Sequence, residues 1–204
     1  LAHRQIGPLA AAGWRVVAPD MRGMGQTEVP AEKEAYDCHR TAGDLAALVT
    51  HLGEEQAVFA GLDFGIFAIF DLAHLHPEKV RGIIALENPH YPDRPDITPL
   101  AEAAEWAKEH FVHIEYFREP GVADADLAAA PRAFLTRVFY ALSGDYHYLD
   151  VWQHPPGTTY LDALPEAPPF PWAWWSEPEM DAIVADYERS GFTGGLNWYR
   201  AMDI

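Results

Sequence analysis

The 204 residues, 49% of them hydrophobic and 22% charged, are enough for one globular domain with an insertion. The 31 acidic and 14 basic side chains give a formal net charge of -17, which repels nucleic acid and anionic membranes, so neither is an expected partner. The single cysteine, Cys38, excludes an internal disulfide, and no apolar stretch is long enough to span a bilayer.

The chain opens with Leu1 in a helix-like stretch, and no signal peptide is visible. We therefore expect that the chain is part of a longer protein. Whether a signal peptide precedes it is left open. We expect a cytoplasmic location, and a homodimer is left open as well.

The first part of the chain alternates strands and helices. Short apolar segments predict strands, and longer segments with apolar residues at helical spacing predict helices between them. In chain order, we expect a strand at 14–18, a helix at 40–52, a strand at 57–60, a helix at 66–76 and a strand at 80–86. Such an order predicts a parallel α/β sheet covered on both faces, with right-handed crossovers. We assign residues 1–88 to this core, which is a partial one.

The pattern changes after residue 88. Helix-like stretches at 100–110, 126–142 and 178–190 are joined by long proline-rich loops. Six of the seven tryptophans lie in this part: Trp106, Trp152, Trp172, Trp174, Trp175 and Trp198. We interpret residues 89–204 as a mostly helical lid with an aromatic lining. An independent helical domain is the alternative.

A five-residue segment between the strand at 57–60 and the following helix carries the strongest chemical signal. It reads Gly61-Leu62-Asp63-Phe64-Gly65 and is similar to the Gly-x-nucleophile-x-Gly elbow of α/β-hydrolases. We expect a strained turn, in which both glycines are needed, to lift Asp63 above the carboxyl ends of the strands. The simpler alternative is that Asp63 only caps the following helix.

An aspartate nucleophile restricts the chemistry. A carboxylate can displace a leaving group from a saturated carbon, which gives an ester in which Asp63 supplies the acyl part. Water activated by a histidine then cleaves that ester, and the backbone N–H of Phe64 is placed to stabilise the oxyanion. Epoxides and alkyl halides are the two substrate classes that fit, and we expect no cofactor and no metal.

Three segments resemble the epoxide hydrolase branch of the α/β-hydrolases, and the likeness runs over essentially the whole chain. They are 13–23 (GWRVVAPDMRG), 116–123 (YFREPGVA) and 190–200 (SGFTGGLNWYR), of which the last is the most specific. The resemblance implies an α/β-hydrolase core with an inserted helical lid. It also implies that a small apolar epoxide reacts with water to give a vicinal diol, as in detoxification.

The same resemblance implies roles for three further residues. The family opens the epoxide with two lid tyrosines, of which one falls on Tyr199 and the other on His113, four residues before Phe117. The Cif-type bacterial subgroup has a His–Tyr pair at these positions, and a glutamate where Glu87 stands. Glu87 would orient the catalytic histidine, unless that acid comes from a later strand. An unperturbed imidazole at His113 would also titrate near pH 6.5.

Each of these roles has a structural alternative. Tyr199 and His113 could simply pack within the lid, and Glu87 could face water at the end of a strand. The resemblance further places the His-Gly-x-Pro oxyanion segment and the catalytic histidine outside this chain, so we expect the segment alone to be inactive.

Two other functions stay open. One is a haloalkane or haloacid dehalogenase on the same fold, although those enzymes favour tryptophan or arginine where Phe64 stands. The other is an inactive hydrolase-like binding module.

Overall fold

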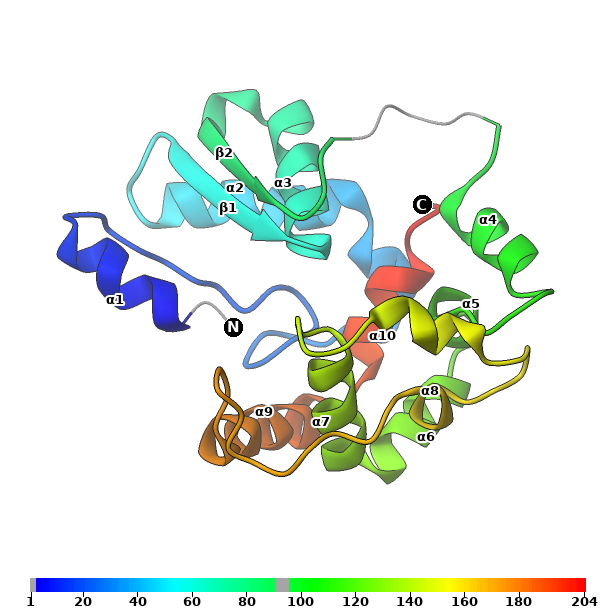
Figure 1. Ribbon diagram of the computed structural model, residues 1–204. Helices are drawn as coiled ribbons and strands as arrows, with labels where there is room; N and C mark the ends of the chain where they lie inside the picture. The colour runs from blue at the N-terminus through cyan, green and yellow to red at the C-terminus, as the bar shows by residue number, and fades with distance from the viewer. Residues whose placement is uncertain (1–2, 91–95) are drawn as a thin grey trace.

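The computed structural model of the protein describes residues 3–90 and 96–204. From residue 38 to residue 86 the elements follow the expected order, and Figure 1 shows the two strands side by side with helices packed against them. The elements are α2 (Cys38–His51), β1 (Ala57–Leu62), α3 (Phe64–Leu75), the short 3-10 helix η2 (Pro77–Lys79) and β2 (Val80–Leu86). The strands β1 and β2 are parallel, with Leu62 opposite Leu86. The parallel α/β arrangement is therefore confirmed.

Local sequence explains where these helices begin and what they bury. The side chain of Asp37 accepts a hydrogen bond from the Arg40 N–H at the start of α2, which is the usual way an aspartate caps a helix. Helix α3 buries Ile66, Ile69 and Leu72, and it packs against α2 and both strands. The interior of this part lies between the two helices and one face of the sheet.

The strand predicted at 14–18 is wrong. After α1 (His3–Ala11) the backbone turns at Gly13 with φ 90°, and residues 14–20 are irregular, with Trp14 59% exposed. A strand needs a neighbour to take its backbone hydrogen bonds. Among residues 3–90 and 96–204, β1 and β2 are the only strands, and they pair with each other.

The expectation that helices cover both faces of the sheet is also not met within the described residues. Phe59 packs against the core, but the alternate side chains Val58 and Leu62 on β1 are exposed, as are Ile84 and Leu86 on β2. Successive side chains of a strand point to opposite faces. One face of this two-stranded sheet is therefore open.

The rest of the chain is helical, as the lid interpretation predicts. The helices are α4 (Pro99–Trp106), α5 (His113–Arg118), α6 (Val122–Ala129), α7 (Pro131–Ala141), α8 (Tyr160–Ala163), α9 (Glu177–Ser190) and α10 (Thr193–Arg200). A 3-10 helix, η3 (Tyr148–Gln153), lies between α7 and α8, and another, η1 (Lys33–Tyr36), precedes α2 in the first part of the chain. The single helix expected at 126–142 is wrong, because it is broken at Ala130. Pro131 has no N–H and disfavours helical backbone in the residue before it.

Two hydrophobic clusters hold the molecule together. The larger consists of buried residues between Phe111 and Leu196, and the smaller of residues between Met21 and Ile83 together with Trp198 and Ala201. Helix α10 therefore contributes to both. A division into a core at 1–88 and a lid at 89–204 stays a proposal, in which α10 joins the two parts. No helix of the described residues combines the length and apolar character needed to cross a bilayer.

Candidate active site

Asp63 lies in the sharp turn between β1 and α3. Its backbone has φ 54° and ψ -134°, and its Oδ1 accepts a 2.6 Å hydrogen bond from the N–H of the next residue, Phe64. An ordinary helix cap has extended backbone and bonds the second or third N–H of the helix. Asp63 does neither, so capping α3 does not explain its conformation.

The two glycines of this turn are not equivalent. A Cβ atom on Gly61 would lie 2.6 Å from Cδ1 of Ile69 and 2.8 Å from the backbone of Gly65, whereas a Cβ on Gly65 would meet nothing within 4 Å among the neighbours present. The close approach of α3 to the end of β1 therefore requires glycine at position 61. The expectation that both glycines are needed is supported at Gly61 alone.

Glu87 occupies the matching position at the end of β2. The pairing of Leu62 with Leu86 puts Asp63 and Glu87 one residue beyond the ends of adjacent parallel strands. Both side chains are exposed. They are also the two non-glycine residues with positive φ in the described parts of the chain. Such strained backbone is uncommon and gathers at functional sites.

Helix α10 brings Tyr199 to the same place, and the arrows of β1 and β2 point toward this helix in Figure 1. Its ring meets Phe64 edge-on, with centroids 4.7 Å apart, and Phe117 at 4.9 Å. Burial and the nearby Asp63 carboxylate raise the pKa of Tyr199 above its ordinary value. The phenol therefore stays protonated at neutral pH and can donate a hydrogen bond.

His113, the first residue of α5, lies beside Tyr199. The two rings are perpendicular, with centroids 5.7 Å apart. Burial lowers the pKa of His113 to about 4, so the imidazole is neutral at neutral pH and does not titrate near pH 6.5 as an unperturbed one would. A neutral imidazole carries one N–H. The structure thus places His113, Tyr199, Phe64 and Asp63 in one continuous group, with Glu87 at the adjacent strand end.

Comparisons with known proteins identify the family of the chain. Residues 2–136 match the model of the alpha/beta hydrolase fold family. The chain belongs to this family. Over 203 residues this α/β-hydrolase is 39% identical to epoxide hydrolase A of Mycobacterium tuberculosis, and over 201 residues it is 34% identical to the bifunctional epoxide hydrolase 2 of Sus scrofa. The crystal structure of epoxide hydrolase A from Mycobacterium thermoresistibile has a TM-score of 0.90 at 39% identity.

These relatives are longer than this α/β-hydrolase. The alignments cover 98% or 99% of the chain, but 62% of the Mycobacterium tuberculosis protein, 35% of the Sus scrofa protein and 63% of the Mycobacterium thermoresistibile chain. The chain therefore spans less than two thirds of the length of the relatives it matches.

The described residues contain no group of three or more histidine, cysteine or acidic side chains that could hold a metal.

Sequence reasoning missed two tyrosines of the α/β-hydrolase lid. The hydroxyl of Tyr148, on η3, lies 3.3 Å from Nδ1 of His113 and 2.5 Å from the hydroxyl of Tyr160, on α8. Neither tyrosine belongs to a recognisable motif. They meet His113 through the packing of three separate helices, and nothing in their spacing along the chain indicates this contact.

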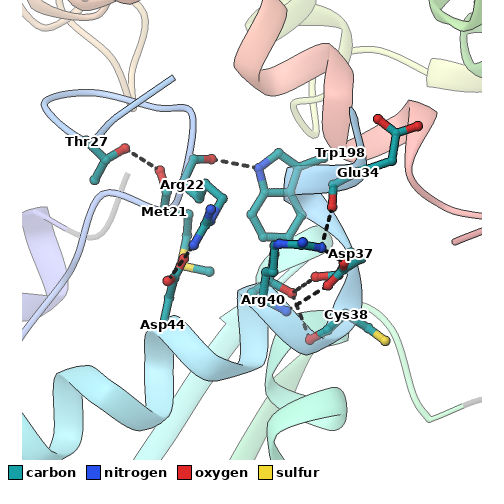
Figure 2. A network of polar contacts seen from close by, with 10 residues as sticks. Met21, Arg22, Thr27, Glu34, Asp37, Cys38, Arg40, Asp44 and Trp198 are labelled. Carbon is teal, nitrogen blue, oxygen red and sulfur yellow. Dashed lines mark hydrogen bonds and ion pairs between the residues drawn. The ribbon is translucent and has the colours of Figure 1, made fainter. Parts of the chain in front are cut away.

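A set of polar contacts anchors α10, and with it Tyr199. Figure 2 shows the indole N–H of Trp198 donating to the backbone oxygen of Arg22, at 2.9 Å. A Cβ atom on Gly194 would lie 1.9 Å from the carbonyl oxygen of Gly23, so α10 and the loop before α2 touch backbone to backbone. These contacts fix the part of the helix that precedes Tyr199.

The last residue of α10, Arg200, is 2% exposed and forms an ion pair with Asp124 of α6, at 2.5 Å. It also donates to the backbone oxygen of Phe117. Burial alone would raise the pKa of Asp124, but hydrogen bonds from Arg200, Thr193 and a backbone N–H outweigh it and lower the pKa to about 2. The ion pair thus connects α10 to the part of the lid that contacts Tyr199.

Replacing Asp124 with asparagine is expected to lower the free energy of unfolding by about 3–5 kcal/mol, because it leaves a buried guanidinium without its counter-ion. Urea unfolding measures the change.

The stability that this ion pair provides also depends on pH. The folded pKa of Asp124 lies below its ordinary value of 3.8. The stabilisation is therefore present above about pH 3.8 and is lost as the pH falls toward 2. Asp181→Asn, in an exposed pair with Arg132, should cost less than about 1 kcal/mol. Equal losses of unfolding free energy in Asp124→Asn and Asp181→Asn would contradict a stabilising role for the buried ion pair.

Proposed function

We propose that the protein hydrolyses small apolar epoxides with water to give vicinal diols, through an ester formed at Asp63. The observation that carries this proposal is the placement of two neutral hydrogen-bond donors, Tyr199 and His113, beside a carboxylate on a strained strand-to-helix turn. The relatives named as epoxide hydrolases support it. We keep a homodimer and a cytoplasmic location as expectations.

In the first step, Asp63 attacks a ring carbon. Its Oδ1 accepts the Phe64 N–H, so Oδ2 is the free nucleophilic oxygen. The C–O bond of the epoxide breaks as the ester bond forms, and the ring oxygen acquires negative charge. The Tyr199 hydroxyl and one N–H of His113 donate hydrogen bonds to that oxygen, and these strengthen as the charge develops.

In the second step, water attacks the carbonyl carbon of the Asp63 ester. Oδ1 then becomes the oxyanion, and the Phe64 N–H already donates to it. When this intermediate collapses, the bond between the carbonyl carbon and Oδ2 breaks, the diol leaves with Oδ2, and the two protons of the water end on the two diol oxygens. The resemblance to the family places the histidine that activates this water outside residues 1–204. Glu87, at the end of the neighbouring strand, would hold that histidine in the useful tautomer and stabilise its charged form. No cofactor enters either step.

Replacing Glu87 with glutamine is expected to slow ester hydrolysis by about a hundredfold or more while ester formation continues. The covalent intermediate should then accumulate, which mass spectrometry of the quenched protein measures. Glu78→Gln, in η2 at the opposite end of β2, is the matched control and should not accumulate ester. Unchanged hydrolysis in Glu87→Gln would assign the acid to a later strand.

A dehalogenase is the main alternative on this fold. Halide release needs N–H donors around the leaving ion, but the Phe64 ring faces Tyr199 and offers none. The deciding experiment offers the whole protein a panel of epoxides and haloalkanes or haloacids, and follows diol and halide. Diol formation alone is expected. Halide release without diol would support a dehalogenase, and no turnover would support a binding module.

A further inference from the structure

A short series of hydroxyl groups leads from His113 into the interior of the lid. Nδ1 of His113 lies 3.3 Å from the hydroxyl of Tyr148, which lies 2.5 Å from the hydroxyl of Tyr160. Tyr160 is 4% exposed, and its ring stacks on the imidazole with centroids 5.8 Å apart. The ring-opening step described above uses none of these hydroxyls.

The direction of the hydrogen bonds follows from the number of protons available. Each hydroxyl donates one hydrogen bond, and Nδ1 either donates or accepts according to the tautomer. If Nδ1–H donated to Tyr148, the two hydroxyl protons would share the single contact between the tyrosine oxygens, and one of them would have no acceptor among the described residues. In the reverse order, Tyr160 donates to Tyr148, and Tyr148 donates to Nδ1. Because a buried donor without an acceptor is costly, the reverse order is favoured.

The indole of Trp152 supports the same direction. Its buried N–H makes no hydrogen bond of ordinary geometry to the described residues. Burial raises the pKa of Tyr148, and the neighbouring Tyr160 and Trp152 side chains act to lower it. An indole N–H can only donate, so toward Trp152 the Tyr148 hydroxyl can only accept. The proton of Tyr148 is then available to Nδ1.

The other ring nitrogen, Nε2, is left for the substrate. Among the described residues it has no hydrogen-bond partner, and it is not one of the unpartnered atoms sealed from solvent. The same holds for the hydroxyl of Tyr199. Two donors in the site thus remain unpaired and open to a ligand.

We propose that Tyr148 and Tyr160 are positioning residues that hold His113 in its Nε2–H tautomer, so that its single N–H is directed to the epoxide oxygen. The proposal rests on the function proposed above. It explains how a neutral imidazole, which could carry its proton on either nitrogen, can replace a tyrosine as a ring-opening donor.

Nitrogen-15 NMR of labelled histidines in the whole protein tests the tautomer without any turnover, with the His113 signals assigned by their loss in His113→Asn. We expect a protonated Nε2, and an unprotonated Nδ1 at the shift of a hydrogen-bonded acceptor. Tyr148→Phe should move Nδ1 toward the shift of a free acceptor nitrogen. Tyr146→Phe, in the same segment without a bond to His113, should leave it unchanged. A protonated Nδ1 in the wild type, or an Nδ1 shift that does not respond to Tyr148→Phe, would overturn the proposal.

Kinetics separates positioning from packing. Tyr148→Phe should slow formation of the Asp63 ester by about tenfold or more, because an imidazole in the wrong tautomer has no proton to give at the site, and should leave ester hydrolysis unchanged. In a His113→Tyr background, which has no Nδ1, it should have no further effect. An equal slowing in both backgrounds would mean that Tyr148 acts through packing alone.

The two proposals fail separately. A protonated Nδ1 in a protein that opens epoxides would overturn the positioning role and leave the function standing. The Nε2–H tautomer in a protein that opens no epoxide would overturn the function instead.

Discussion

Replacing Asp63 with alanine or serine is expected to reduce epoxide turnover by about a millionfold, the scale of losing a catalytic nucleophile. No other carboxylate of the described residues lies at the strand-to-helix turn, so no group can take over ester formation. Turnover of a panel of small epoxides by the whole protein, followed by diol formation, measures the loss.

Two checks keep this result interpretable. Alanine and serine tolerate positive φ poorly, so circular dichroism and thermal unfolding must show that the variants fold. Asp186→Ala removes an aspartate from an exposed pair with Arg189 and should keep wild-type activity. Wild-type turnover in a folded Asp63→Ala protein would show that Asp63 is not the nucleophile.

Replacing Tyr199 or His113 with phenylalanine is expected to slow formation of the Asp63 ester by about a hundredfold each, the scale of losing one oxyanion donor. Each change keeps an aromatic ring and removes the donor. His113→Tyr should keep substantial activity, because a phenol restores the pair of tyrosines that the wider family uses. Pre-steady-state measurement of ester formation in the whole protein gives the rates.

The pH dependence of the same step follows from burial of the imidazole. Because the pKa of His113 is lowered to about 4, the group is neutral above that pH and becomes charged only as the pH falls through it. Ester formation should therefore show no titration of His113 between about pH 5 and 9.

A control variant accompanies the phenylalanine replacements. Tyr140→Phe, on α7 away from the site, is a control for removing a lid hydroxyl. Ester formation at the wild-type rate in His113→Phe would assign His113 to packing.

Local signals in the sequence were enough to predict the turn that carries Asp63 at the centre of the site. The glycine pattern around Asp63 and the apolar strands on either side depend on neighbours within a few residues, and the structure has the turn where the pattern predicts it. His113 and Tyr199 lie far apart in the chain, and only the resemblance to a family paired them. The structure brings their rings together.

Other parts of the molecule depend on tertiary contacts that no local pattern encodes. The segment 14–18 has strand-forming residues but no described strand to pair with. The helix expected at 126–142 breaks because of one proline. The bond between Tyr148 and His113 arises from the packing of η3 against α5. The pKa of His113 follows from burial among aromatic rings, which composition indicates only in general terms.

The central claim is that Asp63 becomes esterified by the substrate and is released by water at its own carbonyl. A single turnover in oxygen-18 water, with the whole protein in excess over an epoxide, tests it most directly. The account predicts that oxygen-18 appears in the carboxylate of Asp63, located by mass spectrometry of the peptide, while the first diol carries unlabelled oxygen from Asp63. Label in the first diol with an unlabelled Asp63 would show that water attacks the epoxide directly, and would contradict the account.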